Sequence, residues 1–221
     1  MTEAKRTIHI KGTGHAAQIP DQVVLSMTLT AQNKEYSAAM KIGSQQVEML
    51  REAIVEAGFK ADDLKTTNFN VRSVYEDEEY REGNSKRYRK IFIGFECRHD
   101  LKLTFDFDND KLNTAVDTVA VSLSQPKISI AFTIKDADAF HDKILKSAAE
   151  NARRKAEILC AALGVKLGKL LEINYSWSEV NIQREVVLGC ALPEYVKKNS
   201  FDFQPDEIKA NDTVDFLWEI E

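Results

Sequence analysis

Cys97 and His99 come closest, by residue type and spacing, to a catalytic pair in this chain. They stand two positions apart in a segment of alternating apolar and polar residues, so one strand face should carry both side chains. Such a pair can form a thiolate–imidazolium nucleophile. The sequence shows neither a turn suited to an oxyanion hole nor a third residue to orient the histidine. We therefore favour His99 as a core histidine bonded to a backbone carbonyl, and Cys97 as a small core residue.

Other residue groups with possible chemistry are better explained by structure. Gly12-Thr13-Gly14 lacks the third glycine of a dinucleotide loop and precedes strand-like residues, so we interpret it as a bulge or turn. The four histidines show no metal-ligand spacing, and Cys97, Cys160 and Cys190 form no Cys-x-x-Cys pair. Asp62-Asp63 is expected at an element boundary, where capping explains it. The sequence therefore predicts no catalytic residue, no cofactor-binding residue, no cofactor and no metal ligand.

Composition limits the class of protein and its partners. The 221 residues include 30 Lys and Arg against 35 Asp and Glu, a net charge of −5. This acidic balance argues against a nucleic-acid partner bound through bulk charge. No apolar run approaches the ~20 residues of a membrane-spanning helix. Charges recur among the first residues before an apolar signal region can form, so we expect a cytoplasmic chain, or a periplasmic or surface one if a signal peptide was removed.

Two hydrophobic periods alternate along the chain and predict its elements. Strands are predicted at 7–14, 22–31, 69–75, 91–107, 128–134, 171–177 and 214–220, and helices at 36–57, 109–121 and 138–163. The resulting order β-β-α-β-β-α-β-α-β-β predicts an α+β fold of helix-covered sheets. The segment 91–107 far exceeds a usual strand of ~5–6 residues, so we expect it to bend, or to pass between two sheets, near Arg98 to Asp100.

An acidic run, a glycine–asparagine pair and a basic run follow the third strand and predict a long hairpin. A two-residue turn at Gly83-Asn84 places Glu78 opposite Arg89. The same register places Asp77 opposite Lys90. The basic run alone could suggest a phosphate or RNA patch, but its acidic partner favours the structural interpretation.

Residues 178–212 form an unusually long connection, of a length that is often functional, mobile or part of an interface. The stretch 186–192 within it is too apolar for a plain linker. It packs either against its own domain or against a neighbouring subunit, and we favour the neighbour. A homo-oligomer is therefore expected.

Five local patterns in this sequence resemble the SIMPL-domain family, a domain of unknown function, and they follow the family's order over nearly the whole chain. They are Ile8-x-Ile10-x-Gly12-x-Gly14, Pro20-Asp21-Gln22, residues 62–69 (DDLKTTNF), residues 152–159 (ARRKAEIL) running into 163–169 (LGVKLGK), and residues 212–216 (DTVDF). The fourth pattern is the most specific. Residues 95–99 (FECRH) differ from the Gly-Tyr-rich stretch common in the family.

The resemblance implies two α+β subdomains, the middle one ferredoxin-like and inserted into the other. We place the inserted subdomain at 86–165 and the outer one at 1–85 plus 166–221. The family includes periplasmic immunogenic proteins, an oxidative-stress defence protein and an animal protein that binds a signalling kinase, and members can form ring-like oligomers. It has no established catalytic residues to carry over to this sequence.

Together these observations predict a non-enzymatic, oligomeric scaffold or interaction protein with possible protein partners and a link to stress tolerance. One alternative is a small-molecule or lipid binding protein that holds an apolar ligand between its subdomains. Another is a thiol-dependent enzyme that uses Cys97 and His99.

Overall fold

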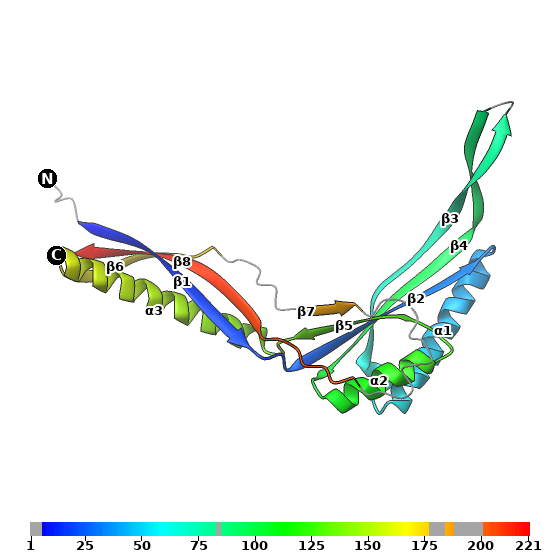
Figure 1. The fold of residues 1–221 in the computed structure, drawn as a ribbon, viewed down its shortest axis with the longest axis horizontal. Coiled ribbons are helices and arrows are strands. Elements are labelled where there is room, and N and C mark those ends of the chain that lie inside the picture. Colours follow the sequence, from blue (N-terminus) through cyan, green and yellow to red (C-terminus); the bar gives the residue numbers. More distant parts are fainter. Residues whose placement is uncertain (1–5, 83–84, 177–183, 188–200) are drawn as a thin grey trace. The chain divides into compact units, whose positions relative to one another are not determined.

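The computed structural model describes residues 6–82, 85–176, 184–187 and 201–221 (Figure 1). In chain order, its elements are β1 (Thr7–Gln18), β2 (Gln22–Asn33), α1 (Tyr36–Glu56), η1 (Ala61–Asp63), β3 (Leu64–Glu82), β4 (Ser85–Asp106), α2 (Asn109–Val121), β5 (Lys127–Thr133), α3 (Ala137–Leu163), β6 (Leu167–Asn174), β7 (Arg184–Val187) and β8 (Ile208–Ile220). The predicted α+β class is confirmed. The predicted elements occur in the predicted order, with the short η1 and β7 in addition.

The chain divides into two compact units. The first unit comprises Met1–Asp21, Thr133–Arg184 and Pro205–Glu221, and the second comprises Gln22–Phe132 and Glu185–Gln204. These boundaries differ from the expected ones at 86 and 165. The reason lies in the sheet: β4 pairs with β3 on one side and β2 on the other, so residues before and after position 86 share one unit.

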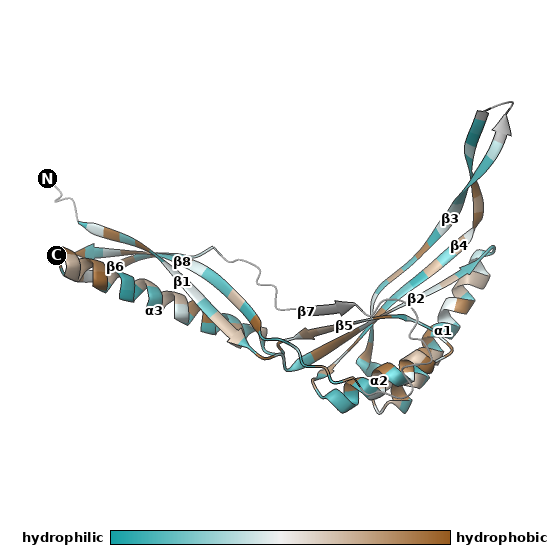
Figure 2. Cartoon of the chain, in the orientation of Figure 1, coloured by the Kyte–Doolittle hydropathy of each residue, from teal (hydrophilic) through white to brown (hydrophobic). Residues whose placement is uncertain are grey.

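The first unit consists of a three-stranded sheet, in the order β1-β8-β6, and α3. β1 and β8 pair antiparallel without interruption, from Thr7 opposite Glu219 to Gln18 opposite Ile208. Asp136 is the N-cap of α3, and its carboxylate accepts a hydrogen bond from the Ala139 N–H (2.8 Å). Figure 2 shows hydrophobic and hydrophilic residues alternating along this helix, as one buried face requires.

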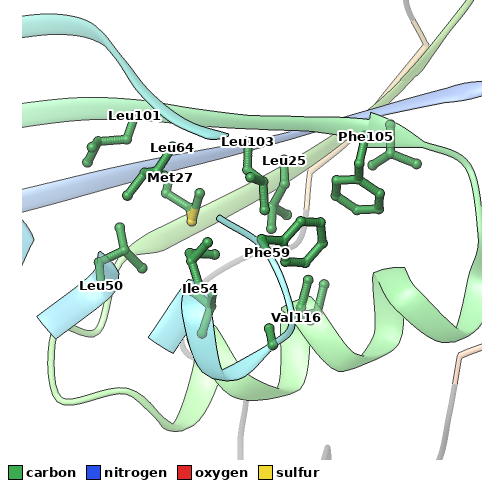
Figure 3. Close-up of a cluster of buried hydrophobic side chains, with 14 of the residues drawn as sticks. Leu25, Met27, Leu50, Ile54, Phe59, Leu64, Leu101, Leu103, Phe105 and Val116 are labelled. Carbon is green, nitrogen blue, oxygen red and sulfur yellow. The ribbon is translucent and has the colours of Figure 1, made fainter. Parts of the chain in front are cut away.

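The second unit holds a five-stranded sheet in the order β3-β4-β2-β5-β7, and both α1 and α2 contribute to its main core. Figure 3 shows Leu25 of β2 and Leu103 of β4 facing Ile54 of α1 and Val116 of α2, and all four side chains are fully buried or nearly so. From β2 to β5, this unit follows the order β-α-β-β-α-β.

The long hairpin has the register that the sequence predicted. Glu78 lies opposite Arg89 and Asp77 opposite Lys90, while the turn at 83–84 lies outside the described residues. β4 stays within one sheet, so the expected passage between two sheets is wrong. Two register shifts interrupt its pairing with β3 instead, one beside Asp100 and one beside Gly94, and such bulges bend a strand without ending it.

Part of the apolar stretch 186–192 falls outside the described residues, as does Trp177 of the strand predicted at 171–177. Residues 186 and 187 belong to β7, at one edge of the five-stranded sheet. Within the part of the chain that the structure describes, no helix is both long and apolar enough to span a membrane.

Candidate functional site

Cys97 occupies a buried position on β4, between Ala31 of β2 and Val71 of β3. α1 crosses the sheet closely here, because a Cβ added to Gly43 would lie 2.8 Å from the Cys97 Sγ. Burial raises the pKa of the Cys97 thiol. The side chain therefore fills a tight helix–sheet contact as a protonated thiol, which confirms it as a small core residue.

His99 is half-buried at the rim of the same core rather than inside it. Its Nε2 lies 3.0 Å from the Thr66 hydroxyl oxygen, and its ring packs edge-on against Phe69, with centroids 5.2 Å apart. Burial lowers the pKa of His99 and is the largest effect. The Asp100 charge raises this pKa and the Arg51 charge lowers it, so the pKa lies below its ordinary value. The predicted bond to a backbone carbonyl is thus replaced by one to a threonine hydroxyl, because β3 supplies that hydroxyl at the edge of the sheet.

Cys97 and His99 extend from the same side of β4, as predicted, but they have different surroundings. Gly43 covers the thiol, whereas Thr66 and Phe69 engage the imidazole. A reactive cysteine needs a lowered pKa and an accessible sulfur. The geometry therefore does not favour the thiolate–imidazolium pair.

Asp100 organises a polar network on the opposite face of β4. Its carboxylate accepts hydrogen bonds from Thr28 (2.7 Å), Asn68 (3.1 Å) and Arg98 (3.0 Å), and so links β2, β3 and β4. Burial acts to raise the pKa of Asp100, but these hydrogen bonds and the Arg98 charge outweigh it and lower the pKa. The Thr67 hydroxyl also donates to the Asp100 carbonyl at the bulge. Sequence reasoning missed this network. Polar residues at outward-facing positions of neighbouring strands could have indicated it.

Gly12 and Gly14 lie within regular strand β1, where α3 crosses it. A Cβ on Gly12 would collide with the Ala148 carbonyl, and one on Gly14 would collide with the Ile144 carbonyl. The predicted bulge or turn is wrong, because the β1–β8 register continues through both glycines. These glycines permit close helix–strand packing, which explains the motif without a phosphate ligand.

Tyr175, His141 and Asp212 converge in the first unit, although 71 positions separate the outer two residues in the sequence. The Tyr175 hydroxyl donates to Asp212 Oδ2 (3.1 Å) and lies 3.5 Å from His141 Nε2. Nε2 is 3.9 Å from the same carboxylate oxygen, and Asp212 is only 7% exposed. Burial, followed by the hydrogen bond to Asp212, raises the pKa of Tyr175. The tyrosine therefore acts as a hydrogen-bond donor between β8 and the segment after β6.

An open hollow lies beside the C-terminal half of α1. It is lined by Glu48, Arg51, Glu52, Val55, Glu56 and Ala61. Four of these six residues carry charge, so the hollow is poorly suited to an apolar ligand. Within the described ranges, no three His, Cys, Asp or Glu side chains gather closely enough to hold a metal ion.

Comparisons with known proteins agree with the resemblance seen in the sequence. A family model, "SIMPL: Protein of unknown function (DUF541)", matches residues 8–218. The chain is 22% identical to the uncharacterized protein YggE of Escherichia coli (strain K12) over 211 residues, 95% of this chain and 81% of that protein. It is 23% identical to the 26 kDa periplasmic immunogenic protein of Brucella melitensis over 174 residues, 79% of this chain and 68% of that protein.

Proposed function

The chain belongs to the SIMPL family, whose function is unknown, and from this premise we propose that it is a non-enzymatic interaction protein that assembles with copies of itself. The observation that carries the proposal is the apolar surface of β6. This strand is an edge of the three-stranded sheet. Leu170, Leu171 and Ile173 are 46%, 42% and 56% exposed on it.

An exposed edge strand offers unpaired backbone groups to another chain, and soluble proteins usually protect such edges with lysine, proline or a covering element. β6 contains one lysine, Lys169, and no proline. Two register irregularities against β8 modify the edge without covering its leucines. Exposed apolar side chains on an edge strand are typical of a surface that meets another protein chain.

Sedimentation velocity at ~50 µM tests the assembly, because self-association depends on protein concentration. We expect an oligomer, and a strict monomer would overturn the proposal. The double variant Leu170→Lys/Ile173→Lys should lower the mass while preserving the circular dichroism spectrum. Leu123→Lys is the matched control, since Leu123 is 83% exposed and belongs to the second unit, whereas β6 belongs to the first. An unchanged mass of the β6 variant would show that β6 does not form the interface.

The order β-α-β-β-α-β over β2 to β5, with the strand order β3-β4-β2-β5, supports a ferredoxin-like second unit.

The link to stress tolerance rests on the family resemblance. Peroxide survival of a deletion strain, with and without the restored gene, tests that link, and equal survival would contradict it.

A further inference from the structure

The distal part of the β3–β4 hairpin is a two-stranded ribbon, here called the hairpin arm and comprising residues 75–80 and 86–92. β2 pairs with β4 only as far as Asn33 opposite Phe95, so the arm continues beyond the third strand (Figure 1). A two-stranded ribbon alone in water is marginally stable. The arm therefore gains stability if one of its faces is covered.

Side-chain contacts assign the residues of the arm to two faces. Glu79 accepts a hydrogen bond from Tyr88 (3.3 Å) and pairs with Lys86 (2.8 Å), so these three side chains share one face. Tyr75 and Phe92 belong to it as well, because each stands an even number of residues away along its strand and their rings are in contact. We call this the aromatic face. Asp77 and its opposite residue Lys90 complete it.

The other face is already occupied by contacts within the arm. Arg89 pairs with Glu78 (2.6 Å) and lies over the Tyr80 ring, 5.5 Å from its centroid. The guanidinium thus covers the half-buried ring of this face. The aromatic face has no comparable cover over its rings among the described residues.

The aromatic face continues the face of the sheet that α1 covers. Tyr36, the first residue of α1, contacts Phe95, and Phe95 contacts Phe92 (centroids 5.5 and 5.2 Å apart). Phe92 in turn contacts Tyr75, with centroids 5.6 Å apart. α1 begins at Tyr36 and does not extend over the rings beyond it. Phe92 is therefore 44% exposed and Tyr75 is 55% exposed. The layer of rings therefore extends past the helix without an occupant.

We propose that the aromatic face is the docking surface for the aromatic face of a second copy of this chain. This inference rests on the proposed self-assembly and assigns it a second, separate contact surface. The charge pattern of the face selects the second copy as the occupant. Within the arm, acidic Asp77 and Glu79 lie on β3 and basic Lys86 and Lys90 lie on β4, so an acidic row runs beside a basic row as far as position 81, where β3 has Arg81 opposite Lys86.

Such a face is complementary to itself in one orientation. A two-fold axis along the strands places β3 of one copy over β4 of the other. Asp77 then meets the partner's Lys90, Glu79 lies diagonal to the partner's Lys86, and Tyr75 meets the partner's Phe92. A two-fold axis across the strands places β3 over β3 and β4 over β4, where like charges repel. The charge pattern therefore favours two arms that stack face to face and point in the same direction.

Two charge-reversal variants test this orientation. Asp77→Lys/Glu79→Lys makes all four of these charged positions basic, and Lys86→Glu/Lys90→Glu makes all four acidic. Each variant alone should associate about tenfold more weakly than wild type or worse, because four cross-chain pairs become repulsive. An equimolar mixture should recover association, since a basic face then meets an acidic one. Sedimentation velocity of each sample measures the mass.

The control variant is Glu76→Lys/Glu78→Lys, which makes the same change in net charge on the opposite face of β3 and should retain the wild-type mass. Recovery in the mixture also excludes a weakened hairpin as the cause of the lost association. Each variant chain carries the same repulsion within its own hairpin, whether it is alone or mixed. If both reversal variants keep the wild-type oligomer, the arm contact is refuted and the proposed self-assembly stands. A mixture that stays dissociated also refutes the contact. A monomeric wild type overturns both proposals.

Discussion

At the residue scale, Gly14 decides how closely β1 can approach α3. A methyl group there would meet the Ile144 carbonyl, so Gly14→Ala should destabilise the protein by about 1–3 kcal/mol through overpacking. Gly58→Ala is the comparison: its φ of +87° strains a side chain, but nothing lies within 4 Å, so the cost should stay near ~1 kcal/mol. Urea titrations of the variants measure both effects. A wild-type midpoint for Gly14→Ala would contradict the close packing.

The Cys97 thiol should react slowly while the protein is folded, because it is buried and its pKa is raised. Cys160 is also buried, so the experiment uses a Cys190→Ser background and an aromatic disulfide reagent at pH 7. We expect little reaction before unfolding. Leu163→Cys, at a position 74% exposed, provides the rapidly reacting control. A Cys97 that reacts as fast as this control would restore the thiol-dependent enzyme as a hypothesis.

Asp100→Asn should destabilise the protein in a pH-dependent way. The native hydrogen bonds lower the pKa of this carboxyl below its unfolded value of ~3.9. The carboxylate therefore stabilises the folded state fully above pH ~3.9, and this stabilisation disappears as the pH falls through the folded pKa. At pH 7 the loss should be about 1–2 kcal/mol, as for a charge-assisted hydrogen bond. Denaturation midpoints from pH 7 to pH 2 should therefore converge with those of wild type. A constant difference would contradict the ionic contribution.

At the element scale, α3 and α1 begin differently. The Asp136 carboxylate caps α3, whereas the N-cap of α1, Glu35, makes no side-chain capping bond. Asp136→Ala should therefore cost about 1 kcal/mol, and Glu35→Ala should cost almost nothing. Glu35→Ser should stabilise α1, because a serine oxygen can reach its free N–H groups. Thermal melts of the three variants test this, and equal losses for both alanine variants would argue against the assigned caps.

At the scale of the whole molecule, the two units have separate hydrophobic cores. Leu103→Ala in the second unit and Ile144→Ala in the first should each cost about 2–5 kcal/mol, because both side chains are completely buried. Hydrogen exchange should accelerate most in the unit that carries the substitution. Leu163→Ala is the exposed control and should change little. A similar loss for Leu163→Ala would contradict the assigned burial.

Local patterns were sufficient to predict much of this architecture. The hairpin register followed from one turn and two charge runs, and Gly58 after α1 has the left-handed conformation that is typical of a glycine at the end of a helix. Both features depend on residues close together in the chain. The Tyr175–His141–Asp212 contacts were not predictable in this way, because three elements separated in sequence must first pack together.

The sequence by itself determined the family, the α+β class and the order of elements, because hydrophobic period and turn chemistry are properties of neighbouring residues. Only the tertiary structure decided that residues 22–132 share a unit and that Gly12 and Gly14 lie against α3. It also decided that His99 meets Thr66 at the sheet rim. These features depend on which distant strands pair and how closely a helix crosses them, and no local period encodes that choice.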